Sequence, residues 1–176
     1  MSRIPSLRDL PELRRLRFFT GRLLTEADFT LEQDYHRERS RLRNRLLHGW
    51  GVVDGLDVRS TGGHITIAPG VAIDPSGEFV ILRDECAVSV LPCPAAKGSC
   101  FVVVRYAEVP ADPLPPVSGD GDDTDTVRYG SVIEGATCSV QDTAPRAADG
   151  GVAIARLIWR RTQWRVDVRY RRRKVS

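Results

Sequence analysis

The densest group of polar and aromatic residues in the chain runs from His48 to Gly51, so imidazole chemistry is the first function to consider. A histidine that acts as a general base needs an orienting carboxylate and a pocket, and a metal needs further ligands at suitable spacing. The chain holds three histidines, His36, His48 and His64, which are far apart in sequence. We therefore favour a corner between a helix and a strand, in which Trp50 fills the core beneath the helix and the glycines permit the turn.

Two nearby amides fit the same corner. Asn44 and Gln33 are expected to bond backbone groups where the helix meets the strand, because buried polar side chains usually find such partners. The sequence therefore predicts a structural role for them.

A second candidate site is the acidic run Asp120-Gly121-Asp122-Asp123-Thr124-Asp125. Hard cations such as calcium prefer clustered oxygen ligands. An EF-hand loop, however, needs Gly at its sixth position and Glu at its twelfth, where this chain has Asp125 and Ser131. We favour a solvated loop, and cation binding there remains an alternative.

The four cysteines, Cys86, Cys93, Cys100 and Cys138, form no C-x-x-C pair. In a cytoplasmic protein the expected state is a free, mostly buried thiol. A Cys93–Cys100 bridge is the alternative if the protein is later exported.

Catalytic motifs are not found elsewhere in the sequence. It has no evident Ser/His/Asp set, carboxylate pair or phosphate-binding glycine loop. We therefore expect neither an enzyme nor a cofactor, and no metal site.

The C-terminal region is strongly basic and interleaves arginines with Trp159, Trp164 and Tyr170. Such a pattern can bind phosphates and stack bases. The alternation over 164–170 is also typical of a strand with its arginines on one solvent-facing side. Nucleic-acid binding through this region and the basic tail 171–176 is therefore an alternative that we do not favour.

Composition indicates a globular protein. Of 176 residues, 41% are hydrophobic and 28% charged, and no apolar run approaches the roughly 20 residues that span a bilayer. The N-terminus lacks the features of a signal peptide, so we expect synthesis and assembly in the cytoplasm and no membrane span. Basic residues exceed acidic ones by 11 to 7 in residues 1–50 and by 9 to 1 in 156–176, whereas 51–155 hold 15 acidic and 6 basic residues. This asymmetry suits contacts between copies or with charged partners, or it reflects solvated strand faces.

The N-terminal region 1–49 is predicted to be an arm and one long helix. Residues 1–17 form the arm, in which Pro11 could begin a short helix over 11–19. The main helix should begin at Thr25, with Asp28 completing a capping box, and end before Gly49.

Apolar residues follow one narrow stripe along this helix: Leu24, Leu31, Tyr35, Leu42 and Leu46. So narrow a stripe fits a seam between helices. It also fits a surface helix that lies on the protein's own β domain.

From Trp50 the hydrophobic period changes from about 3.6 to 2, which indicates strands. Turn residues at 62–63, 69–70 and 74–77 divide short strands, and 101–106 is a continuous apolar run typical of a central strand. Residues 107–128 are expected to form a mobile acidic loop. The fold class is therefore α+β, an N-terminal arm and amphipathic helix followed by a mostly antiparallel β-sandwich or open barrel over 50–170.

The block 18–58 resembles the opening of a family of small proteins encoded beside phage-tail-like contractile injection systems. The residues that carry the resemblance are Phe19, Gly21, Leu23, Leu24, Thr25, Asp28, Phe29, Glu32, Gln33, Tyr35, His36, Asn44, Arg45, Leu47, His48, Gly49, Trp50, Gly51, Val52, Val53, Gly55 and Leu56. The segments FVVVRYAEVPADPLPP, RYGSVIEGATCSV and VAIARLIW extend it, less specifically, to about residue 170.

This resemblance implies a structural, non-catalytic subunit at or near a baseplate or fibre attachment, which docks on other baseplate and tail proteins. The segment PGVAIDPSGEFVIL is similar to attachment domains of tail fibres and spikes, which implies a homo-oligomer, with a trimer favoured, in a particle that is extracellular in some systems. The residues expected to make these contacts are Phe18, Phe19, Leu24, Phe29, Leu31, Tyr35, Leu42, Leu46, His48 and Trp50. A free-standing adhesion or carbohydrate-binding module remains the other alternative.

Overall fold

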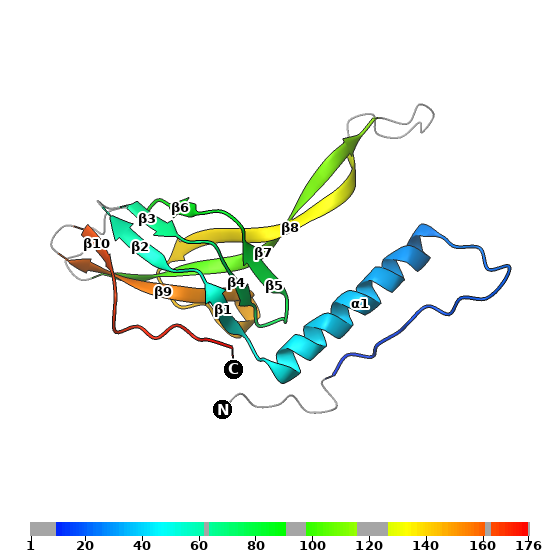
Figure 1. The fold of residues 1–176 in the computed structure, drawn as a ribbon, viewed down its shortest axis with the longest axis horizontal. Helices are drawn as coiled ribbons and strands as arrows, with labels where there is room; N and C mark the ends of the chain where they lie inside the picture. The colour runs from blue at the N-terminus through cyan, green and yellow to red at the C-terminus, as the bar shows by residue number, and fades with distance from the viewer. Residues whose placement is uncertain (1–9, 62–63, 91–97, 116–126, 161–162, 176) are drawn as a thin grey trace.

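The computed structural model describes residues 10–61, 64–90, 98–115, 127–160 and 163–175. Within them the chain forms one α-helix, ten strands and a short 3-10 helix (Figure 1). In chain order these are α1 (Glu26–Leu47), β1 (Gly51–Gly55), β2 (Val58–Thr61), β3 (His64–Ile67), β4 (Gly70–Ile73), β5 (Phe79–Leu82), β6 (Cys86–Val88), β7 (Ser99–Leu114), β8 (Arg128–Gln141), η2 (Ala147–Asp149), β9 (Gly151–Arg160) and β10 (Gln163–Val166).

The strands form three sheets, ordered β1-β4-β5, β10-β9-β7-β8 and β2-β3-β6. Every strand pair in these sheets is antiparallel. All three sheets contribute side chains to one apolar core, whose fully buried members include Val52, Leu56, Ile65, Ile67, Val80, Val102, Val104, Val152 and Leu157. The predicted α+β class with mostly antiparallel strands is confirmed.

The turn predicted at 74–77 connects β4 to β5. Asp74 organises it, because its Oδ1 accepts hydrogen bonds from the backbone nitrogens of Ser76 at 2.8 Å and Glu78 at 2.9 Å. Gly77 has a φ of 97°, which a residue with a side chain adopts only under strain. The sequence therefore predicted both the place and the chemistry of this turn.

Strands β7 and β8 are longer than predicted. The loop expected over 107–128 is shorter, since β7 continues to Leu114 and β8 begins at Arg128. Beyond Arg105 β7 has a partner on one side only, and such a strand tolerates prolines. The prolines of 107–115 therefore misled the prediction, while the acidic run 120–125 lies outside the described residues.

Helix α1 begins and ends where the sequence predicted. The Asp28 carboxylate accepts hydrogen bonds from the Thr25 backbone nitrogen at 3.0 Å and from its hydroxyl at 2.9 Å. These bonds, with Arg22 at 2.6 Å, lower the pKa of Asp28. Gly49 follows the helix with a φ of 71° and lets the chain turn into β1.

The short helix considered for 11–19 is not formed. Residues 10–24, called the arm below, run back along α1 without regular structure (Figure 1). Leu16 is buried, so packing against the rest of the chain replaces the local hydrogen bonds that a helix would have given.

The C-terminal segment differs from the strand expected over 164–170. Strand β10 ends at Val166, and the chain turns at Asp167 and then runs beside β1. There the Val52 nitrogen donates to the Arg173 carbonyl at 2.8 Å, and the Val175 nitrogen donates to the Val52 carbonyl at 3.1 Å. This segment therefore covers the edge of β1 next to the end of α1.

Candidate docking surface

One face of α1 binds the β domain through polar side chains. Glu78 Oε1 accepts hydrogen bonds from Arg41 Nε at 2.8 Å and from Arg37 Nη2 at 3.2 Å. The side chain of Asn44 is buried, and its Nδ2 donates to the Gly77 carbonyl at 2.8 Å. The β4–β5 turn is therefore the seat on which the C-terminal half of α1 rests.

A second anchor connects α1 to β7. Arg37 Nη2 donates to Glu108 Oε1 at 2.6 Å, and the Tyr106 hydroxyl donates to the same oxygen at 2.7 Å. These two bonds, that from Tyr106 foremost, lower the pKa of Glu108, while burial and the Glu108 charge raise the pKa of Tyr106. Glu108 therefore stays ionised and holds Arg37 in place.

The apolar stripe of α1 does not face the β domain. Of the two packings considered, the helix does lie on its own domain, but through Arg37, Arg41 and Asn44. The stripe lies about a third of a turn or more from that face. Leu31, Tyr35 and Leu42 are partly buried, whereas Leu24 and Leu46 are exposed.

A groove of about 620 Å³ lies between the arm and the C-terminal half of α1. Its lining combines leucines with charged and polar side chains: Leu13, His36, Arg39, Ser40, Leu42, Arg43, Leu46 and Leu47. Leu47 is 68% exposed and lies beside the exposed Leu46, and neighbouring exposed leucines are typical of a surface that binds a partner.

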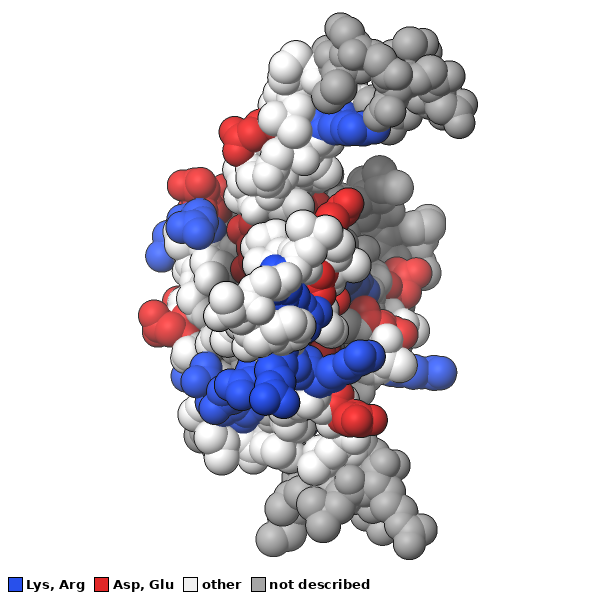
Figure 2. Space-filling model, turned by 90° about the vertical axis from the view of Figure 1, so that its right-hand side faces the viewer, with Lys and Arg blue, Asp and Glu red and all other residues white. Residues whose placement is uncertain are grey.

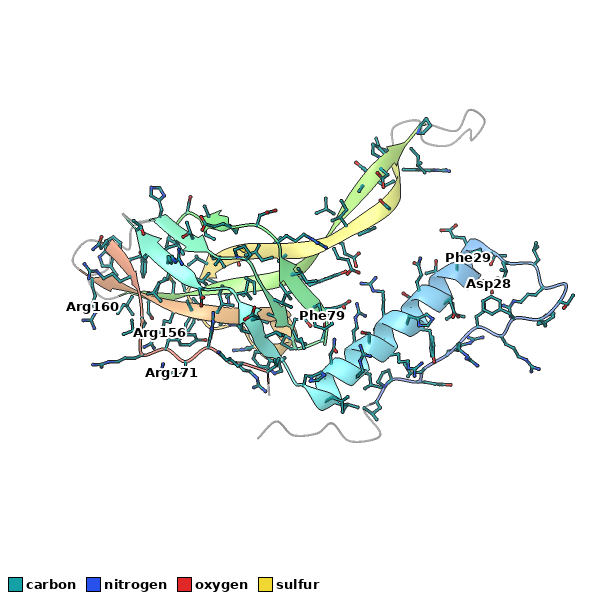
Figure 3. All side chains as sticks on the ribbon, in the orientation of Figure 1. Asp28, Phe29, Phe79, Arg156, Arg160 and Arg171 are labelled. Carbon is teal, nitrogen blue, oxygen red and sulfur yellow. The ribbon has the colours of Figure 1, made fainter. Side chains whose placement is uncertain are left out.

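Three phenylalanines lie exposed around the other end of α1. Phe18 and Phe19 belong to the arm, and Phe29 belongs to the first turns of the helix, next to Asp28 of the capping box (Figure 3). Phe19 is 64% exposed, with the guanidinium of Arg22 5.9 Å from its ring centre. Large apolar side chains are therefore offered to solvent at both ends of the arm and helix.

This end of the molecule is also basic. Figure 2 looks onto the side where the arm and α1 lie and shows Lys and Arg side chains gathered in a band. The exposed arginines of these two elements are Arg14, Arg15, Arg17, Arg39, Arg43 and Arg45. Apolar side chains among arginines suit a partner surface that is both apolar and acidic.

The corner after α1 has the predicted turn but not the predicted core residue. Trp50 is only partly buried, with the Arg173 guanidinium 4.2 Å from its ring centre, and its carbonyl accepts from Arg173 Nε at 2.8 Å. The expectation that Trp50 fills the core was wrong, because the C-terminal segment covers it instead. The side chain of His48 is exposed. Its backbone nitrogen donates the last hydrogen bond of the helix to the carbonyl of Asn44, at 3.0 Å.

The structure thus groups the predicted contact residues on the arm and on α1 and its end. Asn44 bonds backbone as predicted, whereas Gln33 is exposed. The sequence argument missed Leu13 and Leu47, which line the groove, and Glu78, which seats the helix. The spacing of Arg37, Arg41 and Asn44 on one helical face could have revealed the seat.

The basic C-terminal region is partly neutralised by the chain itself. Arg156 Nε donates to Asp167 Oδ2 at 2.8 Å, and Arg172 lies 3.1 Å from Asp57 Oδ1. Arg156, Arg160 and Arg171 are labelled in Figure 3, at the end of the molecule away from the N-terminus of α1. These arginines therefore do not belong to the arm and helix surface.

Among the described residues no three His, Cys, Asp or Glu side chains gather as metal ligands. The part of the chain described here also holds no helix with the length and apolar character to cross a bilayer.

Comparison with known proteins identifies solved structures with a similar fold. No family model matches the sequence, and no curated protein matches it. Among solved structures, the chain is similar to TssK in a crystal structure, with 14% identity, a TM-score of 0.55 and coverage of 89% of this chain and 41% of that one.

Two further matches come from assemblies. One is a chain of the TssK-TssF-TssG baseplate subcomplex of the type VI secretion system, with 14% identity, a TM-score of 0.54 and coverage of 92% of this chain and 62% of that one. The other is a chain of a type VI secretion baseplate complex, with 13% identity, a TM-score of 0.52 and coverage of 92% and 60%. This chain therefore spans between two fifths and about three fifths of the length of the chains it matches. The resemblance to proteins of phage-tail-like injection systems is confirmed at the level of the fold, which is one found in type VI secretion baseplates.

Proposed function

We propose that this protein is a structural subunit of a phage-tail-like contractile injection particle, located at or near its baseplate or fibre attachment. The observation that supports this most is the fold, which matches baseplate chains over 92% of the present chain. The proposed partners are other baseplate subunits, which would be to this chain what TssF and TssG are to TssK. The protein acts by binding, without catalysis or a cofactor, after synthesis and assembly in the cytoplasm.

The docking surface is the arm together with α1. Its leucine groove lies along the C-terminal half of α1, its exposed phenylalanines lie around the N-terminal end, and exposed arginines lie along both elements, while a separate polar face holds α1 on the β domain. Because the polar and apolar faces of α1 are separate, a partner can bind the apolar face without displacing the helix from the β4–β5 turn.

We further propose that the protein is a trimer in the particle, with contacts along the stripe of α1. Leu13 of the arm lines the groove together with Leu42 of the stripe, and Leu24 and Leu46 are exposed at the two ends of the stripe. These ends are where neighbouring copies would meet.

The test is a pull-down of tagged protein from its native cells after nuclease treatment, read by mass spectrometry. The wild type is expected to recover sheath, tube and baseplate proteins. A variant with Leu46→Asp and Leu47→Asp should lose them, because two charges in the groove prevent apolar contact. Val168→Asp is the matched control, since Val168 is also highly exposed but lies in the C-terminal segment.

Recovery of no particle protein by the wild type would contradict the function. Recovery that the groove variant leaves unchanged would keep the function and contradict the docking surface.

The alternatives from the sequence have less support. Nucleic-acid binding would use a C-terminal region whose Arg156, Arg172 and Arg173 are held by the chain itself. Carbohydrate binding would use exposed aromatic residues of the β domain, such as Tyr129. The same pull-down distinguishes both alternatives from the proposed function, since each of them predicts that no baseplate protein is recovered.

A further inference from the structure

The distal part of the β7–β8 hairpin is a ribbon of two strands. Pairing between β7 and β9 ends at Arg105, whereas pairing between β7 and β8 continues to Leu114 and Arg128. Among the described residues, 108–114 and 128–134, called the ribbon below, therefore pair only with each other, and Figure 1 shows them projecting from the body of the molecule.

The ribbon is apolar for so exposed a structure. Six large apolar side chains in or next to it are between 50% and 59% exposed: Val109, Leu114, Val127, Tyr129, Val132 and Ile133. A two-stranded ribbon buries too little surface to be more than marginally stable in water by itself. An additional strand or surface is therefore expected to cover it.

The two edges of the ribbon differ. The β7 edge carries Pro110 and Pro113, and Asp112 has a positive φ of 57°, all of which oppose the addition of a strand. The β8 edge is the outer edge of its sheet, and its sequence from Tyr129 to Ile133 contains neither proline nor charge. The open edge is therefore that of β8.

We propose that the β8 edge of the ribbon pairs with the same edge of a second copy of this chain, antiparallel and centred on Ser131. A two-fold axis at Ser131 makes β8 complementary to itself. The facing pairs are Ser131 with Ser131, Gly130 with Val132, Tyr129 with Ile133, and Arg128 with Glu134.

Two of the facing pairs, Tyr129 with Ile133 and Arg128 with Glu134, are favourable ones. An aromatic residue opposite a β-branched residue, and opposite charges facing one another, are the cross-strand pairs that stabilise sheets. By symmetry the dimer contains each of the last two pairs twice. Arg128 also interacts within its own chain, and the five N–H donors of a guanidinium allow it a second partner.

The register explains why a second copy is the occupant. A shift of one residue would place side chains on opposite faces, and a shift of two would separate Arg128 from Glu134. The contact uses a surface distinct from the arm and α1, so it goes beyond the proposed function and does not depend on it.

The first test is site-directed disulfide formation in the full-length protein, with oxidised glutathione as oxidant. Ser131→Cys places two thiols opposite each other across the two-fold axis, where strand partners have Cα atoms about 4.5–5.5 Å apart, within the range of a disulfide. Ile133→Cys is the matched control, because it lies on the same strand face but about 14 Å from its counterpart in this register. Both variants retain the native cysteines.

We expect a reducible dimer band for Ser131→Cys at several times the yield of Ile133→Cys. Equal yields from the two variants, or a dimer for neither, would overturn the proposal.

The second test exchanges charges. Arg128→Glu and Glu134→Arg each place like charges opposite one another twice, so each variant alone should dimerise on the order of tenfold more weakly than the wild type. An equimolar mixture of the two should restore dimers, because every facing pair is then opposite in sign. Sedimentation velocity measures both effects, and a mixture no better than its components would contradict the register.

Discussion

Gly77 occupies the most constrained position where α1 meets the β domain. A Cβ atom there would lie 2.3 Å from the Arg41 carbonyl oxygen, and the residue has a φ of 97°. Gly150 is the natural comparison, because it too has a positive φ, of 65°, but no atom within 4 Å of an added Cβ.

We predict that Gly77→Ala destabilises the protein more than Gly150→Ala. Both substitutions incur backbone strain of about 1–2 kcal/mol, and Gly77→Ala also forces α1 from its seat at a cost of a further 1–3 kcal/mol or so. Urea unfolding measures the difference. If the two variants lost equal amounts of unfolding free energy, α1 would be able to move away from residue 77 at no cost.

Asp167 is a buried carboxylate whose charge should make stability depend on pH. Its side chain is buried, and the hydrogen bonds from Arg156 and from the Arg169 nitrogen lower its pKa. A carboxyl whose pKa is lowered on folding stabilises the protein above its unfolded pKa, which is about 3.9 for Asp, and loses that contribution as the pH falls through the folded value.

The melting temperature of the wild type should therefore exceed that of Asp167→Asn by a constant margin at pH 5–7, and the margin should shrink below about pH 4. Scanning calorimetry from pH 7 to pH 2.5 checks this. A margin that persists to the lowest pH would mean that packing, and not charge, accounts for the effect of the substitution.

At the scale of elements, α1 is held by a small polar cluster while its apolar stripe faces elsewhere. Glu78 accepts from both Arg37 and Arg41 and is more deeply buried than either. Removal of this carboxylate leaves two partly buried arginines without a shared partner.

We predict that Glu78→Ala increases the exchange of backbone amides in the C-terminal half of α1 and has little effect in β9. Glu38→Ala is the control. Glu38 also forms an ion pair with Arg41, at 2.5 Å, but this pair lies within the helix and does not connect the helix to the β domain. Hydrogen-exchange mass spectrometry resolves the two regions. Unchanged amide exchange in the helix of Glu78→Ala would show that the hydrogen bond from Asn44 to Gly77 is enough to hold the helix on the β domain.

How much of the fold was predictable follows from the range of the interactions involved. The cap at Thr25, the stop at Gly49 and the turn at 74–77 depend on residues close in sequence, and their side-chain chemistry revealed them. The continuation of β7 from 107 to 114 was missed, because its prolines are tolerated only on an open edge that no local pattern shows.

The candidate docking surface was predictable only where it depends on residues close together in sequence. The stripe residues could be identified from their period, but the groove depends on Leu13 from the arm, whose path along α1 is a tertiary contact. Trp50 was misplaced because its cover comes from Arg173, at the other end of the described chain.

At the scale of the whole molecule, two projections extend from one β body: the ribbon, and α1 with its arm (Figure 1). If neighbouring copies meet at the exposed ends of the stripe, as we propose, then Leu24→Asp with Leu46→Asp should reduce the solution mass to that of a smaller species. Light scattering checks this, with Val168→Asp as the control. A mass that stays trimeric would remove the stripe from the interface.

The C-terminal segment gives the chain a late step in its folding. Arg173 bonds the carbonyl of Trp50, a residue 123 positions earlier, and the neighbouring backbone closes on Val52. Contacts of such long range form slowly, and during synthesis this one must await residues 173–175. The corner after α1 is therefore covered only once residues 173–175 have been made, whereas Gly77 and Glu78, which hold the C-terminal half of the helix, are made about a hundred residues earlier.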